Sequence, residues 1–107
     1  MSKDRLVRIL ADFRNELAKI LGDRLKAIYL YGSQARGEAK SDSDIDVLVV
    51  IRTEFDYFDL LDRTTQLVSN LSLENDVVIS PVFVTKEQYL HHQIPLLINV
   101  RREGIAV

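Results

Sequence analysis

The sequence predicts a small α/β (α+β) domain in which helices pack on a mixed β-sheet. Two apolar segments, residues 25–31 and 45–51, consist largely of residue types that favour strands. Two longer segments, residues 6–21 and 57–71, repeat apolar residues every three or four positions, which indicates amphipathic helices. The chain of 107 residues has the usual length of one independent fold, so we expect residues 1–107 to form a single domain.

The N-terminal part of the chain predicts a helix followed by a strand. Ser2 can cap the N-terminus of this helix, and Gly22 can adopt the left-handed conformation that ends it. Its apolar stripe consists of Leu6, Leu10, Phe13, Leu17 and Leu21. The strand at residues 25–31 is apolar on both faces, which predicts a central position in a sheet that helices cover. The segment after it, residues 32–43, is predicted to be a loop with one helical turn.

Residues 45–51 give the strongest strand signal, and a second helix is expected after them. Thr53 and Asp56 resemble a capping pair at its start. Its apolar stripe consists of Tyr57, Leu60, Leu61, Leu67, Val68 and Leu71. A third strand is predicted over residues 77–84. Because Pro81 lacks a backbone N–H, this strand should be an edge strand or carry a bulge.

The C-terminal part predicts two more helices. Thr85 and Gln88 form a capping box that opens a short helix through His91. Pro95 suits the first position of a last helix, which ends at Gly104. The expected order is therefore helix, strand, loop, strand, helix, strand, helix, helix.

Composition and charge exclude several classes of function. The formal net charge of −2 and the pI of about 5.6 argue against a dedicated nucleic-acid binder, which needs many phosphate-neutralising cations. The absence of cysteine excludes disulfides and thiolate chemistry. No apolar run approaches the ~20 residues of a membrane span, and no signal-peptide pattern is present. We expect a cytoplasmic protein that does not bind membranes.

The residues that carry chemistry lie between Tyr31 and Val47. Gly32 and Ser33 come where a buried strand gives way to a helical turn. A glycine there lets the backbone approach a ligand closely, and the N–H groups of the turn suit a phosphate. Asp44 and Asp46 are two residues apart at the start of a strand, so both carboxylates face the same side.

Two carboxylates this close repel each other unless a cation lies between them. Their hard oxygen atoms suit Mg²⁺, which takes one or two carboxylates together with substrate phosphates. Ten residues separate Ser33 from Asp44, enough to bring the turn and the carboxylates to one edge of two neighbouring strands. The sequence therefore predicts a phosphate site beside a metal site, as phosphoryl or nucleotidyl transfer requires.

These residues resemble the signature of the DNA polymerase β-like nucleotidyltransferase superfamily: Gly32-Ser33, ten residues, then Asp44-x-Asp46. The fuller pattern resembles its minimal nucleotidyltransferase (MNT) branch. The matching residues are Gly32, Ser33, Ala35, Arg36, Gly37, Ser43, Asp44, Asp46 and Val47. The expected element order also matches that small fold over nearly the whole chain.

The resemblance implies a two-Mg²⁺ transfer from a nucleoside triphosphate. Asp44 and Asp46 would hold the metals, Gly32 and Ser33 would bind the β- and γ-phosphates, and Arg36 and Ser43 are further candidates for nucleotide binding. MNT proteins commonly act as antitoxins encoded beside a HEPN-domain ribonuclease toxin, and some adenylylate a tyrosine of that toxin. By this analogy the donor is ATP and the acceptor is a protein side chain.

The superfamily usually has a third carboxylate on a later strand, where it serves as the base. Asp76 is the candidate for this role and for a further metal ligand, because it is expected to open the third strand. If Ser80 is instead level with the metals, the base is missing. Arg36 can alternatively pair with Glu38 or Asp42.

Two other interpretations remain open. An antitoxin could neutralise its partner by contact alone, with a vestigial active site. Transfer to a small molecule is disfavoured because relatives with that activity carry an extra helical domain, for which this chain has no residues. His91 and His92 are interpreted as a solvated pair, since adjacent helical residues face different directions. We expect a homo- or hetero-oligomer.

Overall fold

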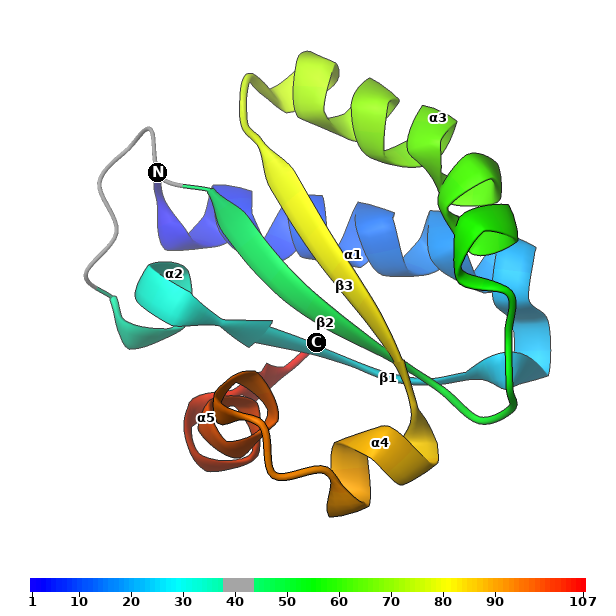
Figure 1. The fold of residues 1–107 in the computed structure, drawn as a ribbon. Helices are drawn as coiled ribbons and strands as arrows, with labels where there is room; N and C mark the ends of the chain where they lie inside the picture. Colours follow the sequence, from blue (N-terminus) through cyan, green and yellow to red (C-terminus); the bar gives the residue numbers. More distant parts are fainter. Residues whose placement is uncertain (38–43) are drawn as a thin grey trace.

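The computed structural model describes residues 1–37 and 44–107, and it confirms the predicted mixed α/β architecture (Figure 1). In chain order the elements are α1 (Lys3–Leu21), the 3₁₀ turn η1 (Gly22–Arg24), β1 (Leu25–Tyr31), α2 (Gly32–Arg36), β2 (Ile45–Ile51), α3 (Tyr57–Asn75), β3 (Ile79–Thr85), α4 (Lys86–His91), α5 (Pro95–Glu103) and β4 (Ile105–Ala106). None of the described helices is both long and apolar enough to cross a membrane.

The strands form one sheet in the order β3-β2-β1-β4. β1 is antiparallel to β2 and β4, whereas β2 and β3 are parallel. As predicted, β1 is central and β3, which contains Pro81, is an edge strand. The short strand β4 was not predicted. Its two residues, Ile105 and Ala106, pair with Leu30 and Tyr29 only because α5 returns the chain to this edge.

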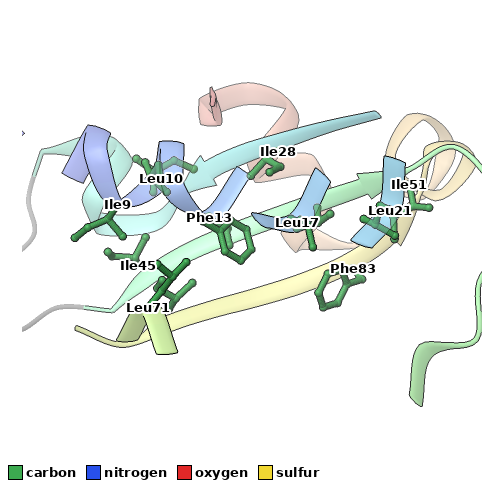
Figure 2. Packing of buried hydrophobic residues seen from close by; sticks show 14 of the residues in the cluster. Ile9, Leu10, Phe13, Leu17, Leu21, Ile28, Ile45, Ile51, Leu71 and Phe83 are labelled. Carbon is green, nitrogen blue, oxygen red and sulfur yellow. The ribbon is translucent and has the colours of Figure 1, made fainter. Parts of the chain in front are cut away.

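Helices α1 and α3 pack on one face of the sheet and enclose the main core. This core joins apolar residues of both helices to those of β1, β2 and β3 (Figure 2). The residues labelled there are Ile9, Leu10, Phe13, Leu17, Leu21, Ile28, Ile45, Ile51, Leu71 and Phe83. A smaller cluster on the opposite face packs α4 and α5 against the sheet and contains Leu48, Val50, Val84, Leu97 and Val100. The sheet is therefore the middle of three layers.

The predicted ends of α1 and the predicted start of α4 are confirmed. The Ser2 hydroxyl accepts a hydrogen bond from the Arg5 N–H at 3.1 Å. Gly22 follows α1 with φ +55°, which a residue with a Cβ rarely adopts. In the capping box of α4, the Gln88 N–H donates to the Thr85 hydroxyl at 3.1 Å, and the Thr85 N–H donates to the Gln88 side chain at 2.9 Å.

The predicted pair at the start of α3 needs correction. Asp56 alone is the N-cap, where its carboxylate accepts a hydrogen bond from the Asp59 N–H at 3.0 Å. Thr53 lies three residues too early, because a capping side chain must come immediately before the first helical residue. Its hydroxyl instead accepts a hydrogen bond from the Arg24 guanidinium at 3.4 Å.

Candidate active site

Asp46 lies in a row of three polar side chains that crosses the sheet. It is the register partner of Tyr31 on β1 and of Ser80 on β3. Register partners project from the same face, so all three side chains lie on the face that α4 and α5 partly cover. Tyr31, Asp46 and Ser80 are each half-buried, whereas Asp44 is exposed just before β2. Asp46 is therefore the less exposed of the two carboxylates, and strand pairing on both sides fixes its backbone.

The environment of Asp46 disfavours its negative charge. Burial raises the pKa of Asp46, and the negative charge of Asp44 raises it further. Burial and the charge of Asp46 likewise raise the pKa of the Tyr31 hydroxyl. A divalent cation bound beside Asp46 would relieve this repulsion, and the oxygen donors of carboxylates suit Mg²⁺. The donor set thus fits the predicted metal, although no cluster of three His, Asp or Glu side chains suited to a metal occurs within residues 1–37 and 44–107.

Gly32 makes the closest approach to this site. It begins α2 with φ +74°, and a Cβ added to it would lie 2.8 Å from the Asp46 Oδ2 atom. The backbone can therefore pack against the carboxylate only because this residue has no side chain. Gly32, which directly follows β1, and Asp46 of β2 are both predicted site residues, and the β1–β2 pairing brings them together.

Ser33 is the second residue of α2 and is half-buried. The N-cap position belongs to Tyr31, whose side chain makes no capping hydrogen bond. Ser33 is therefore not the N-cap of α2. The predicted phosphate-binding turn lies directly beside Asp46, at the N-terminus of a one-turn helix without a side-chain cap.

Of the two further candidates for nucleotide binding, Arg36 and Ser43, the structure describes only Arg36. Arg36 ends α2, and its guanidinium lies 3.7 Å from the Glu103 carboxylate of α5. This partner was not predicted, because only the fold brings the end of α5 to α2. Glu38 and Asp42, the partners expected from the sequence, lie outside the described residues, and so does Ser43.

We predicted that Asp76 opens the third strand, and this prediction is wrong. It follows the last residue of α3 in the left-handed conformation, with φ +52°. The Asp76 N–H donates to the Leu73 carbonyl and the Val77 N–H donates to the Ser72 carbonyl, which is the Schellman pattern of a helix end. Strand β3 begins three residues later, so Ser80 rather than Asp76 is level with Asp46.

Replacing Asp76 with glycine should raise the free energy of unfolding by up to about 1 kcal/mol, because glycine adopts the left-handed conformation without strain. We also expect nucleotidyl transfer to be unchanged, since Asp76 belongs to the helix end. Urea denaturation and a transfer assay on the same preparation check both parts. Loss of transfer in a stable Asp76→Gly protein would restore Asp76 as a catalytic carboxylate.

Tyr31 is the residue of this row that the sequence interpretation missed. It was assigned only to the apolar strand, although it directly precedes Gly32 and is therefore fixed beside the site. Strand alternation alone could not identify it, because the register between β1 and β2 decides which residue faces Asp46.

Two grooves of the described chain lie away from the carboxylates. One, of about 780 Å³, lies between α1, α2 and the C-terminal residues, and another, of about 860 Å³, lies between α1 and α3. Neither is lined by Asp44, Asp46 or Ser80.

The fold and the site define a nucleotidyltransferase. The family model described as "Polymerase beta, Nucleotidyltransferase" matches residues 15–98, and this chain belongs to that family. The match includes both carboxylates and the Gly32–Ser33 turn.

Two relatives from Methanocaldococcus jannaschii are similar over most of the chain. "Putative protein adenylyltransferase MJ0141" is 32% identical over 81 residues, covering 76% of this chain and 81% of the relative. "Putative protein adenylyltransferase MJ0604" is 35% identical over 89 residues, covering 83% of this chain and 80% of the relative.

Solved structures share the fold. "Structure of putative minimal nucleotidyltransferase" has a TM-score of 0.64 and 29% identity, covering all of this chain and 97% of that one. "Crystal structure of the toxin-antitoxin with AMP-PNP" has a TM-score of 0.61 and 19% identity, covering 99% of this chain and 72% of that one. The resemblance to minimal nucleotidyltransferases is confirmed.

Proposed function

We propose that this chain is a Mg²⁺-dependent adenylyltransferase that transfers AMP from ATP to a side-chain hydroxyl of a partner protein, as the antitoxin of a HEPN-type toxin. The observation that carries the proposal is the packing of the Asp46 carboxylate against Gly32, with Asp44 two residues away. This packing supports the proposal of a divalent-cation site directly beside a phosphate-binding turn.

Asp44 and Asp46 would hold the metal. Bound there, Mg²⁺ supplies charge stabilisation for a triphosphate and polarises its phosphoryl oxygens. Gly32 and Ser33 would bind the β- and γ-phosphates through the first turn of α2. Arg36 and Ser43 are further candidates for nucleotide contacts. The transfer forms a bond between the acceptor oxygen and the α-phosphorus, breaks the bond from the α-phosphorus to the bridging oxygen of pyrophosphate, and releases the hydroxyl proton to water.

The donor, the acceptor and the partner are supported by the relatives. The two similar proteins from M. jannaschii bear names that describe adenylyl transfer to protein. A structural neighbour is a toxin–antitoxin complex with AMP-PNP, and another is titled "Crystal structure the toxin-antitoxin MntA-HepT", with a TM-score of 0.53 and 19% identity. Together they favour ATP as donor and a toxin as acceptor.

One observation favours the alternative of a non-catalytic antitoxin. Ser80 occupies the β3 position in register with Asp46, so a hydroxyl stands where a third carboxylate was considered. A chain that neutralises its partner by contact alone would tolerate this difference.

Intact-mass analysis tests the proposed function. The protein encoded beside this chain is incubated with the chain and Mg²⁺-ATP, and we expect its mass to increase by whole AMP units. The reaction should stop when EDTA removes the metal. A stable complex without any mass increase would leave the non-catalytic antitoxin as the function.

A further inference from the structure

The groove of about 780 Å³ lies between α1, α2 and the sheet edge that β4 forms. Its lining is mostly apolar. Two of the lining side chains are large exposed aliphatic groups, Val7 of α1 at 57% and Ile105 of β4 at 49%. A concave apolar surface with exposed aliphatic side chains on two of its walls is typical of a binding site.

Strand β4 has one backbone edge to which no described strand pairs. The Val107 N–H donates to the Ile28 carbonyl at 2.9 Å, so these two residues form a hydrogen-bonded pair across β4 and β1. Bonded and non-bonded pairs alternate along antiparallel strands, so the neighbouring pair, Ala106 and Tyr29, is a non-bonded one. The backbone N–H and C=O groups of Ala106 therefore point away from β1. An edge of this kind can pair with a further strand.

The side chains beside this edge form an apolar surface on the α1 side. Ile105 is the register partner of Leu30, which belongs to the main core, so Ile105 projects from the sheet face that α1 covers. The Arg14 guanidinium of α1 donates to the Val107 carbonyl at 2.9 Å and holds the end of β4 beside α1. Alternate side chains of a strand added to β4 would therefore lie next to Ile105 and Val7.

The charged side chains that line the groove are cationic. Lys3, Arg14 and Arg36 contribute to its walls, and none of its described lining residues is acidic. Arg36 lies 3.7 Å from the Glu103 carboxylate, whereas Lys3 is exposed and forms no ion pair with a described residue. A second copy of this chain would bring like charges together, so the charge complement of the groove is a segment with acidic side chains.

We propose that a segment of a partner protein binds in this groove in extended conformation, as an additional strand on β4. The segment has apolar residues at alternate positions and acidic residues near its ends. Its backbone pairs with Ala106, its apolar side chains contact Val7 and Ile105, and an acidic side chain pairs with Lys3. A small apolar anion supplies similar side-chain contacts but has no backbone to pair with β4. The inference goes beyond the proposed function and does not depend on it, because the groove does not include the two carboxylates.

Fluorescence anisotropy with a labelled peptide tests the proposal. The probe is fluorescein-labelled Glu-Thr-Val-Thr-Val-Thr-Glu, in which both valines and both glutamates share one side of the extended chain. Titrations in EDTA without nucleotide keep the result independent of AMP transfer. The main variant is Ala106→Pro, which removes the N–H at the unpaired edge without removing a hydrogen bond between β1 and β4. Its matched control is Ala106→Val, which keeps that N–H.

We expect the wild type and Ala106→Val to bind the peptide with Kd values within about twofold of each other. Ala106→Pro should bind it about tenfold more weakly, the scale of one lost hydrogen bond. Lys3→Glu should weaken binding about fivefold without destabilising the fold, because an acidic residue is favourable in the first turn of a helix. A peptide with lysine in place of both glutamates should also bind more weakly than the probe.

Equal affinities of Ala106→Pro and Ala106→Val would overturn the proposed strand pairing, and an unchanged affinity of Lys3→Glu would overturn the charge complementarity. Failure of the wild type to bind the peptide would overturn the proposal as a whole. Binding of dodecanoate without binding of the peptide would do the same, since it would identify a site for a small apolar anion.

Discussion

Replacing Asp46 with asparagine is expected to lower nucleotidyl transfer by at least about a hundredfold while making the metal-free protein more stable. Transfer falls because an amide cannot replace a half-buried carboxylate as a Mg²⁺ ligand. Stability rises because burial and Asp44 both oppose the charge of Asp46 in the folded chain. Transfer rates and thermal unfolding in EDTA, measured for both proteins, check the two effects together.

The gain in stability should depend on pH. Since the pKa of Asp46 is raised on folding, the folded chain binds this proton more tightly than the unfolded chain. The stability that the protonated group provides is fully present below the unfolded pKa, about 3.9. It is lost as the pH rises through the higher folded pKa. The Asp46→Asn variant has no carboxyl group to titrate at this position. Its melting temperature should therefore rise above that of the wild type as the pH increases from the unfolded to the folded pKa of Asp46. At higher pH the difference should stay constant.

Asp44→Asn provides the matched control, because Asp44 is the second cause of the raised pKa. Removing its charge should shift the transition of Asp46 toward lower pH without abolishing it. An Asp46→Asn protein that still transfers AMP at the wild-type rate would contradict the metal-binding role. A melting-temperature difference independent of pH would contradict the electrostatic cause of the stability gain.

Local patterns in the sequence were sufficient for the helices and the three long strands. The bounds of β1 and β2 coincide with the predicted residues 25–31 and 45–51, because each largely apolar segment is flanked by charged or glycine residues. Pro81 also predicted the edge position of β3 correctly, since a missing backbone N–H is tolerated there. These signals depend only on neighbouring residues.

The strand register and the end of α3 could not be predicted from neighbouring residues alone. Asp76 was assigned to a strand because its left-handed conformation is usually provided by glycine, and no glycine marks the end of α3. Ser80 was therefore considered only as the alternative, because its position beside Asp46 depends on the pairing of β2 with β3. Strand β4 was missed because two residues carry no periodic signal. The Arg36–Glu103 ion pair likewise joins segments far apart in the chain.

Gly32→Ala and Gly37→Ala should have different effects, although the two glycines lie at opposite ends of α2 with almost the same φ angle. Their φ angles are +74° and +71°, so an alanine at either position incurs the left-handed strain of about 1–2 kcal/mol. The added methyl group at Gly37 meets no atom within 4 Å, whereas at Gly32 it would lie 2.8 Å from the Asp46 Oδ2 atom.

We therefore expect Gly37→Ala to lower the free energy of unfolding by this strain alone and to retain transfer. Gly32→Ala should lose more stability, and its transfer rate should fall about a hundredfold because the Asp46 carboxylate is displaced. Urea denaturation and single-turnover transfer with Mg²⁺-ATP measure both quantities. Equal losses of transfer in the two variants would show that the turn, and not the contact between Gly32 and Asp46, limits activity. A selective loss in Gly32→Ala would show that the glycine is required because a metal-binding carboxylate lies against its backbone.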